Sequence, residues 1–230
     1  MEIKVLGYGN VIYPDRKKMW PAILIKNPTG NILLDISPAY ICASRNELNK
    51  IRIILLSHQH ADHIVGFPLY AAYIASRKIK KENILVIGGK KTIKSVQRIT
   101  EESYPEFSNL FLSPFKFIEL NRKLEFIDLP GVRVIAKKVE HFGSDSYSFV
   151  VELGEVRIGY TGDVGNVSGL NFFFSGCDIL FAEMGNRRGH LKREDIEILK
   201  RSVGKIFVIH SKDSDVPEII RIPDHEQDLA

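Results

Sequence analysis

The stretch Ser57-His58-Gln59-His60-Ala61-Asp62-His63 places three histidines and an aspartate within six positions. It directly follows the apolar run 51–56, which predicts a short, fully buried strand. In a chain that stays extended beyond that strand, side chains repeat every second residue. We therefore expect His58 and His60 to project to the same side, where they can bind one metal ion.

The second half of this stretch enters a different pattern. Asp62 and His63 are followed by the apolar run 64–70, which predicts a helix. These two side chains need not point the same way as the preceding histidines, and they are better placed to bind a second ion beside the first. Histidine and aspartate are typical ligands of zinc and other borderline metals. A polar loop is the alternative, but a buried strand end seldom carries so many polar groups without a partner.

The composition predicts one globular domain over residues 1–230, or a tightly fused pair of halves. The chain is 44% hydrophobic and has no low-complexity tract, so it can bury a core without disulfide staples. Cys42 and Cys177 lie far apart in apolar surroundings, and we expect both to be reduced core residues. The formal net charge of +4 suits anionic substrates such as phosphate esters, although many ordinary proteins share it.

The first residues, Met1-Glu2-Ile3-Lys4, open directly into a strand pattern, without the basic and apolar segments of a signal peptide. No apolar run approaches membrane-spanning length. We therefore expect a cytoplasmic protein with no membrane partner.

Further chemically active side chains occur at strand ends in the second half of the chain. Four of them stand at or just after the end of an apolar strand pattern: His141, Asp163, Glu183 and His210. Side chains that arrive on several strand ends converge at one edge of a sheet. With His190, which precedes a helix predicted over 192–202, six of the seven histidines fit this arrangement, and His225 remains in the polar tail.

Local patterns predict three other features. The runs 22–25 and 31–35, joined by a Pro-Thr-Gly turn, predict a hairpin. A Ser-Pro pair at its start indicates a helix over about 37–48. The runs 115–118 and 124–127 mostly alternate, so we expect them to pair as strands of a sheet with one face in the core.

These residues resemble the metallo-β-lactamase superfamily over nearly the whole chain. The superfamily's H-x-H-x-D-H motif, isolated third histidine, bridging aspartate and last histidine match His58, His60, Asp62, His63, His141, Asp163 and His210. The chain looks most like the ribonuclease Z and cyclic-phosphodiesterase branch, which has an additional Gly-His element, here Gly189-His190, before the last helix. The Ser-Tyr-Ser-Phe run after His141 also resembles that branch. The resemblance implies an α/β fold of the αββα type, a four-layer sandwich with helices outside two facing sheets.

The resemblance also implies two divalent metal ions, with zinc as the first expectation and manganese or iron as alternatives. It implies that the first ion is held by His58, His60, His141 and Asp163. It implies that the second is held by Asp62, His63, His210 and the same Asp163, which bridges the two. Asp62 is expected to belong to the catalytic set as well. Asp35, at a strand end, is expected to orient a ligand histidine, although a plain strand-end aspartate fits nearly as well.

Two ions about 3.5–4 Å apart can share a water and lower its pKa toward neutrality, which supplies a bridging hydroxide. By resemblance, His190 is the candidate general acid, and Glu183 is expected to raise its pKa and fix its ring. Arg187 and Arg188 could bind a substrate phosphate, and Tyr147 could donate to a substrate oxygen. A solvated loop is the alternative for the histidine and the arginines, and strand packing is the alternative for the tyrosine.

The sequence thus predicts a dinuclear metal-dependent phosphodiesterase that acts on a cyclic or small phosphodiester or on an RNA 3′ end. The same ion pair would activate water for a lactone or thioester, and iron on this scaffold could support redox chemistry. A metal-binding RNA-interaction module is the non-enzymatic alternative, although every ligand position is intact. The long glycine- and proline-marked arm by which ribonuclease Z enzymes grip transfer RNA has no convincing equivalent here. Relatives alone suggest a homodimer.

Overall fold

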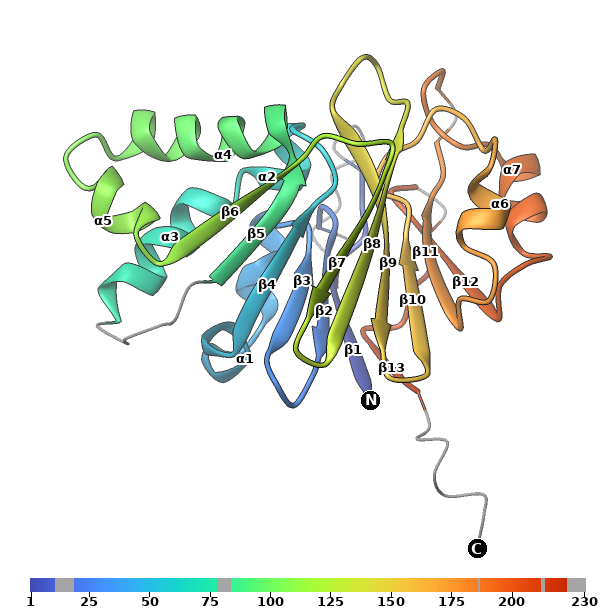
Figure 1. The fold of residues 1–230 in the computed structure, drawn as a ribbon, viewed down its shortest axis with the longest axis horizontal. Coiled ribbons are helices and arrows are strands. Elements are labelled where there is room, and N and C mark those ends of the chain that lie inside the picture. Colours follow the sequence, from blue (N-terminus) through green and yellow to red (C-terminus); the bar gives the residue numbers. More distant parts are fainter. Residues whose placement is uncertain (11–18, 78–83, 186, 212–213, 223–230) are drawn as a thin grey trace, which may run out of the picture.

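Two β-sheets face each other at the centre of the computed structural model, and helices cover their outer faces (Figure 1). The structure describes residues 1–10, 19–77, 84–185, 187–211 and 214–222, so His225 lies outside the described residues. Within that part of the chain, one sheet has seven strands and the other has six. This is the α/β four-layer sandwich that the resemblance implied.

The seven-stranded sheet combines the first half of the chain with its last described strand. Its strands are β1 Glu2–Gly7, β2 Ala22–Lys26, β3 Asn31–Leu34, β4 Ile51–Leu56, β5 Ile84–Gly89, β6 Phe115–Leu120 and β13 Ile219–Arg221. Their order is β13-β1-β2-β3-β4-β5-β6. Strands β3 to β6 run parallel, whereas β13, β1, β2 and β3 pair antiparallel. The hairpin predicted over 22–35 is confirmed as β2 and β3.

The six-stranded sheet is built entirely from the second half of the chain. Its strands are β7 Leu124–Leu129, β8 Val132–Val139, β9 Ser146–Leu153, β10 Val156–Tyr160, β11 Ile179–Glu183 and β12 Lys205–Ile209. Their order is β12-β11-β10-β9-β8-β7. Strands β7 to β10 are antiparallel neighbours, and β10, β11 and β12 are parallel.

Three apolar cores hold the four layers together. The helices outside the first sheet are α1 Arg45–Asn49, α2 Ala61–Ile64, α3 Phe67–Ser76, α4 Lys90–Ser103 and α5 Ser108–Leu112, preceded by a 3-10 helix Pro38–Cys42. Those outside the second sheet are α6 Leu170–Phe173 and α7 Arg193–Leu199, the latter shorter than predicted. One core lies between the sheets, and one lies under each layer of helices.

Strand β2 shows why the central strands are apolar at nearly every position. Ile23 and Ile25 belong to the core between the sheets, whereas Leu24 belongs to the core under the helices, and all three are fully buried. Because strand side chains alternate between faces, a strand covered on both sides needs apolar residues on both. The polar residue of β2, Lys26, accordingly stands at the end of the strand.

Five such polar residues follow strands whose carboxyl ends face the same region of the sandwich. Asp35 and His58 follow the parallel strands β3 and β4. Asp163 follows β10, Glu183 ends β11 and His210 follows β12, and these three strands are also parallel. Ligands sit at the carboxyl ends of parallel strands in many α/β folds. The topology thus brings distant parts of the sequence to one place.

The prediction of a single helix over 37–48 is wrong. Ser37 does cap a helix, since its hydroxyl accepts the N–H two residues later at 3.1 Å, but that 3-10 helix ends at Cys42. Ser44 then begins α1: it accepts the N–H of Glu47 at 3.3 Å, and the Glu47 carboxylate accepts the N–H of Ser44 at 2.7 Å. This capping box is a strong start signal, so a second helix begins where the prediction continued the first.

The predicted pairing of 115–118 with 124–127 is also wrong. Strand β6 pairs in parallel with β5, and β7 pairs antiparallel with β8, so the two strands belong to different sheets. The chain crosses from one sheet to the other within residues 121–123. Alternation indicates a strand with one buried face, and each of these edge strands has that property whichever neighbour it pairs with.

The two cysteines differ in their surroundings. Cys177 is buried as predicted, and burial raises the pKa of its thiol to about 12. Cys42 is exposed, contrary to the prediction, because Ala39 and Tyr40 occupy the inward side of its short helix. None of the helices in the described part of the chain is long and apolar enough to span a membrane.

Glu47 joins α1 to strands β1 and β2 of the first sheet. Its carboxylate lies 2.7 Å from Nζ of Lys26 and 3.6 Å from Nζ of Lys4, in addition to its capping bond with Ser44. Burial acts to raise the pKa of this carboxyl, but the hydrogen bonds and cations outweigh it and lower the pKa from 4.5 to about 2.

We expect Glu47→Gln to lower the free energy of unfolding by about 1–3 kcal/mol at neutral pH. Because the folded-state pKa is depressed, the carboxylate stabilises the fold above the unfolded-state pKa of 4.5, and this contribution is lost as the pH falls toward about 2. Urea unfolding across that window should show the variant and the wild type converging. Glu218→Gln, which removes an exposed partner of Lys4, is the matched control. If the difference in free energy of unfolding between Glu47→Gln and the wild type did not change with pH, this account would be contradicted.

Candidate metal centre

The loop 57–63 lies at the base of the candidate site. Strand β4 ends at Leu56, and the backbone is still extended at His60, which immediately precedes α2. The rings of His58 and His60 lie together, with centroids 4.4 Å apart. Asp62 and His63 lie within the single turn of α2, where both are buried. The sequence pattern therefore places four ligand-type side chains in one region, as expected.

Asp35 is the hydrogen-bond centre beneath these histidines. Its fully buried carboxylate accepts from the N–H of Ser57 at 2.7 Å and from the hydroxyl of the same residue at 2.7 Å. It also accepts from the hydroxyl of Tyr160 at 2.5 Å and from Nδ1 of His63 at 2.6 Å. Since Tyr160 ends a strand of the second sheet, these bonds join the two sheets beneath the site.

This network determines which nitrogen of each ring faces the site. A carboxylate can only accept, so His63 donates from Nδ1 and keeps its lone pair on Nε2. The Ser57 hydroxyl donates its one proton to the Asp35 carboxylate, so it can only accept from Nδ1 of His58, at 3.0 Å. His141 donates from Nδ1 to a backbone carbonyl at 2.8 Å. All three rings therefore turn Nε2 toward the site and, when neutral, present its lone pair there, as metal-binding histidines do.

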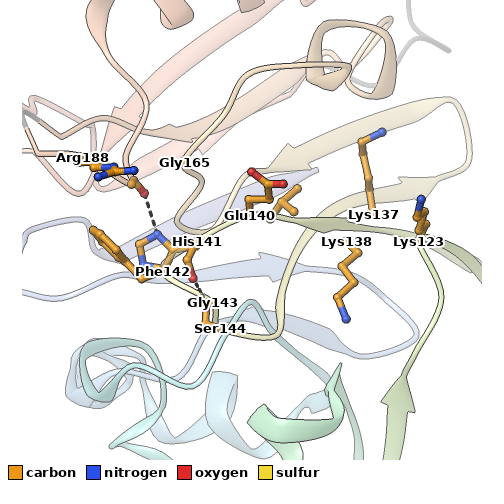
Figure 2. Close-up of a pocket in the computed structure, with 12 residues that line it drawn as sticks. Lys123, Lys137, Lys138, Glu140, His141, Phe142, Gly143, Ser144, Gly165 and Arg188 are labelled. Atoms are coloured by element: carbon orange, nitrogen blue, oxygen red, sulfur yellow. Dashed lines mark hydrogen bonds between the residues drawn. The ribbon is translucent and has the colours of Figure 1, made fainter.

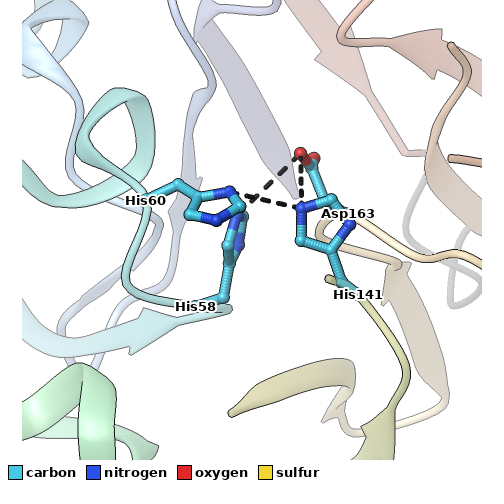
Figure 3. A group of neighbouring side chains, drawn as sticks. All are labelled: His58, His60, His141 and Asp163. Atoms are coloured by element: carbon cyan, nitrogen blue, oxygen red, sulfur yellow. Dashed lines mark hydrogen bonds and ion pairs between the residues drawn. The ribbon is translucent and has the colours of Figure 1, made fainter. Parts of the chain in front are cut away.

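The ligand-type atoms form three overlapping groups, one of which joins Asp163 and His210 to Glu183 and His190. The first contains His58, His60, His141 and Asp163, whose ligand atoms lie within 4.8 Å of one another (Figure 3). Nε2 of His58 lies 3.9 Å from Oδ2 of Asp163, and Nε2 of His141 lies 3.6 Å from the same oxygen. Nε2 of His141 is also 3.2 Å from Nδ1 of His60.

The second group lies beside the other carboxylate oxygen of Asp163. It contains Asp62, His63 and His210. Nε2 of His63 is 3.4 Å and Nδ1 of His210 is 3.6 Å from Oδ1 of Asp163. Nε2 of His210 is 3.1 Å from Oδ2 of Asp62. The two groups therefore meet at a single carboxylate, each on its own oxygen.

Several of these atoms are buried without a hydrogen-bond partner. Among the described residues, this holds for Nε2 of His58, Nε2 of His63, Nδ1 of His210 and Oδ1 of Asp163. Leaving a buried polar atom unsatisfied costs about 1–3 kcal/mol. Two ligands about 2.1 Å from a tetrahedral zinc ion are about 3.4 Å apart, and the separations around Asp163 range from 3.4 to 3.9 Å. The donor set and its spacing fit divalent metal ions.

Burial and charge set the protonation of these groups. Burial holds the pKa of His58 well below its usual range and lowers that of His141 to about 4, so both rings are neutral at neutral pH. Burial opposes ionisation of Asp163, but the surrounding histidines outweigh it and hold its pKa well below 3.8. Burial also opposes protonation of His63, but Asp163 and Asp35 hold its pKa well above 6.5. A bound cation would take the place of that proton.

Glu183 and His190 form a hydrogen-bonded pair beside the two groups. Oε2 of Glu183 accepts from Nδ1 of His190 at 3.1 Å, while Oε1 accepts from the N–H groups of Val164 and Leu191, both at 2.9 Å. Burial acts to lower the pKa of His190, but the contact with the Glu183 carboxylate outweighs it and raises that pKa. Nδ1 of His190 is 3.8 Å from Oδ2 of Asp163. The pair is therefore within reach of a substrate bound at the two groups.

Unusual backbone conformations concentrate at this site. Three non-glycine residues of the described chain have positive φ, and all lie here: Asp35 at +53°, Phe142 at +42° and His210 at +58°. Such conformations cost about 1–3 kcal/mol each and persist where the surrounding structure fixes them. Gly162, with φ +57°, allows Asp163 to approach, since a Cβ there would lie 2.5 Å from Cβ of Ser57.

The structure separates the three predicted substrate contacts. Arg188 is exposed and lines a groove that opens beside His141. Arg187 is exposed on the same loop but does not belong to the described lining of that groove. The prediction that Tyr147 contacts the substrate is wrong. Its side chain is fully buried in the core between the sheets, and its hydroxyl donates to the carbonyl of Arg122 at 3.3 Å.

Sequence reasoning did not identify Ser57, Tyr160 or Phe142 as part of the site. Ser57 and Tyr160 each stand within a few positions of a proposed ligand, which was the available signal. Their role depends on Asp35, which only the packing of the two sheets brings to them. Phe142 directly follows His141, but its exposure could not be predicted from an apolar residue type.

Comparison with known proteins identifies the class to which this fold and site belong. Residues 30–206 match the family model described as the beta-lactamase superfamily domain, and the chain belongs to this family. The resemblance to this superfamily, which was based on the histidine and aspartate motifs, is therefore confirmed.

Curated relatives match part of the chain. Ribonuclease Z of Saccharolobus solfataricus is 31% identical over 133 residues, which are 56% of this chain and 40% of that protein. Ribonuclease Z of Agathobacter rectalis is 27% identical over 146 residues, which are 61% of this chain and 45% of that protein. The chain thus matches less than half the length of these relatives. The crystal structure of human tRNase Z, short form, shares the fold, with TM-score 0.79, 19% identity and coverage of 97% of this chain and 100% of that chain.

We expect Tyr160→Phe to weaken zinc binding about tenfold, because Asp35 would lose one donor and hold His63, the expected ligand, less firmly. Zinc affinity would be measured by competition with a chromogenic chelator. Tyr147→Phe removes a hydroxyl from an equally buried tyrosine that donates elsewhere, and it should leave the affinity unchanged. Equal losses in the two variants would indicate general destabilisation and argue against a positioning role for Tyr160.

Proposed function

We propose that this protein is a dinuclear metal-dependent phosphodiesterase. The observation that carries the proposal is the convergence of buried, unpartnered ligand atoms on both oxygens of Asp163. One ion would be held by His58, His60, His141 and Asp163. The other would be held by Asp62, His63, His210 and Asp163. Zinc suits this set of imidazole and carboxylate ligands, and manganese or iron are the alternatives.

When bound, two such ions supply a nucleophilic water of lowered pKa and neutralise charge on a phosphoryl group. The protein's own contribution is to position a proton donor for the leaving oxygen. Glu183 holds Nδ1 of His190, so Nε2 of that ring is the atom that would deliver the proton. Two backbone N–H groups hold the Glu183 carboxylate in turn, which fixes the orientation of the ring.

The charge around the site supports a phosphodiester over a lactone or thioester. The groove beside the centre is lined by four cationic side chains, those of Lys123, Lys137, Lys138 and Arg188. Glu140 is the carboxylate in its described lining. A neutral acyl substrate would gain little from this excess of positive charge, whereas a phosphodiester is attracted by it. The name of the curated relatives, ribonuclease Z, also supports phosphodiester hydrolysis.

We expect the purified protein to bind two divalent ions per chain, measured by elemental analysis after dialysis. His210→Ala removes a side chain that belongs to the second group and not to the first, so this variant should retain about one ion. His190→Ala should retain two, because Nδ1 of His190 is bound to Glu183. A wild-type chain that binds one ion, or none, would rule out the dinuclear centre.

We expect the metal-loaded protein to hydrolyse both bis-p-nitrophenyl phosphate and a dinucleoside phosphate. In the second substrate the leaving group is an alkoxide that needs a proton, so His190→Ala should lower kcat about 10²–10⁴-fold. In the first, p-nitrophenolate leaves readily without one, and the same variant should have a much smaller effect. The ratio of wild-type kcat to variant kcat is compared between the two substrates. A proton donor gives a much larger ratio for the dinucleoside phosphate, whereas a residue that merely supports the fold gives similar ratios for both.

Other results would assign a different function. Turnover of a lactone or thioester, without turnover of either phosphodiester, would indicate an acyl hydrolase. Visible absorbance together with iron in the elemental analysis would indicate redox chemistry. A chain that binds its metal ions and RNA but turns over none of these substrates would be a non-catalytic binding module.

A further inference from the structure

We propose that the groove beside the metal centre binds a single-stranded nucleic acid, with one base stacked on Phe142 and the neighbouring phosphates bound by Lys137 and Lys123. The inference rests on the proposed phosphodiesterase function, and it selects one substrate class among those that the metal centre alone would accept.

The groove begins at the metal centre and extends away from it. It opens at His141 and has a volume of about 890 Å³, near the upper end of the roughly 300–1,000 Å³ typical of small-ligand pockets. Figure 2 shows Phe142 and Arg188 at one end, with Lys123 and Lys137 at the other. A ligand that reaches both ends must be an extended one.

The backbone presents Phe142 to solvent at an energetic cost. Phe142 has φ +42°, Gly143 has φ +70°, and the N–H of Ser144 donates to the carbonyl of His141 at 2.8 Å. Two consecutive positive φ values are typical of a type I′ turn, whose central positions favour asparagine and glycine. Phenylalanine is sterically unfavourable there. With 61% of its surface exposed, it also gains little from burial, so a strained aromatic at this position indicates function.

The Phe142 ring is held against the reactive groups. Its centroid lies 4.8 Å from that of His141 and 5.8 Å from that of His190, both in edge-to-face geometry. The ring also lies against the backbone of Gly189, where a Cβ would collide with it. The ring is thus fixed beside a proposed ligand and the proposed proton donor, while most of it remains accessible. This is the arrangement of a stacking platform for a base next to the scissile phosphate.

The far end of the groove offers unpaired positive charge. In the part of the chain that the structure describes, Lys123, Lys137 and Arg188 take part in no ion pair. Lys138 is different, because its Nζ is bound to Asp145 at 2.7 Å. Glu140 offsets part of this charge, but the groove remains cationic. Lysines that are free of ion pairs bind the phosphates of a nucleic-acid backbone without regard to sequence.

The combination of an aromatic platform and distant lysines favours a single strand over the alternatives. A base can stack on a side chain only when it has left its neighbours in the helix, which excludes a continuous duplex. A small cyclic phosphodiester could occupy the metal centre, but it would leave Lys123 and Lys137 without an anionic partner, since the Nζ of Lys137 lies over the ring of Phe173, 5.8 Å from its centroid. A strand of several nucleotides uses both ends of the groove.

The stacking half of the proposal is tested by binding to the metal-loaded protein, measured by fluorescence anisotropy. The probes are labelled phosphorothioate strands: single-stranded RNA, single-stranded DNA of the same sequence, its duplex, and an abasic strand of the same length. We expect the wild type to prefer the base-bearing single strands over the abasic strand about tenfold. Phe142→Asn should abolish this preference, and since asparagine suits the turn better than phenylalanine, misfolding would not explain the loss. Phe142→Trp should retain the preference.

The electrostatic half is tested with the double variant Lys123→Ala/Lys137→Ala. It should weaken binding of base-bearing and abasic strands equally. It should also reduce the slope of log affinity against log salt by about 0.7 for each phosphate that a lysine no longer neutralises. Lys50→Ala removes an exposed lysine at the opposite end of β4 and should change neither quantity.

Three results would overturn the proposal. These are equal wild-type affinity for base-bearing and abasic strands, an unchanged salt slope in the lysine variant, and tighter binding of the duplex than of either single strand. Hydrolysis of bis-p-nitrophenyl phosphate is measured on the same preparations. Binding does not require turnover, so an inactive protein with the expected binding would refute the phosphodiesterase and keep the groove. An active protein without that binding would keep the phosphodiesterase and refute the nucleic-acid groove.

Discussion

The buried carboxylate of Asp35 is the contact on which the geometry of the site depends. It accepts hydrogen bonds from Ser57 and His63, which follow a strand of the first sheet, and from Tyr160 on the second sheet. Because a carboxylate cannot donate, it directs the free nitrogens of His63 and, through Ser57, of His58 toward the same point. A residue that lies beneath these rings thus sets which nitrogen each of them turns toward the site.

That network is possible only because two independent sheets meet at this edge. The first sheet supplies the Ser57–His63 loop at the end of a parallel strand, and the second supplies Asp163, Glu183 and His210 on three adjacent parallel strands. The core between the sheets is a cluster of buried apolar side chains, and because protein cores are close-packed it fixes the separation of the two sets of strand ends. A shift of one sheet relative to the other would break the Tyr160–Asp35 bond and change the ligand distances together.

The sequence allowed prediction of whatever depends on neighbours along the chain. The spacing of the histidine motif and the polar residues at strand ends could be recognised because strand periodicity is local. The contact between Tyr160 and Asp35 could not, since 125 positions separate the two residues and neither has a distinctive neighbourhood. The same limit explains the errors. Alternation does not reveal which sheet an edge strand joins, as β6 and β7 show, and a strand tyrosine such as Tyr147 gives no sign of which face it occupies.

The site is closed on one side and open on the other, and this asymmetry bears on its chemistry. His58, His63, His141 and His210 are buried, whereas His60 and His190 are partly exposed. In the proposed enzyme a substrate would reach the centre past these two histidines, and the ring of Phe142 lies beside His190. A leaving group that departs by the same route would pass His190, which is held by the buried carboxylate of Glu183. The proposed ligand set alone would serve several hydrolytic reactions, so in the proposed enzyme the choice among them would lie with the residues that line this entrance.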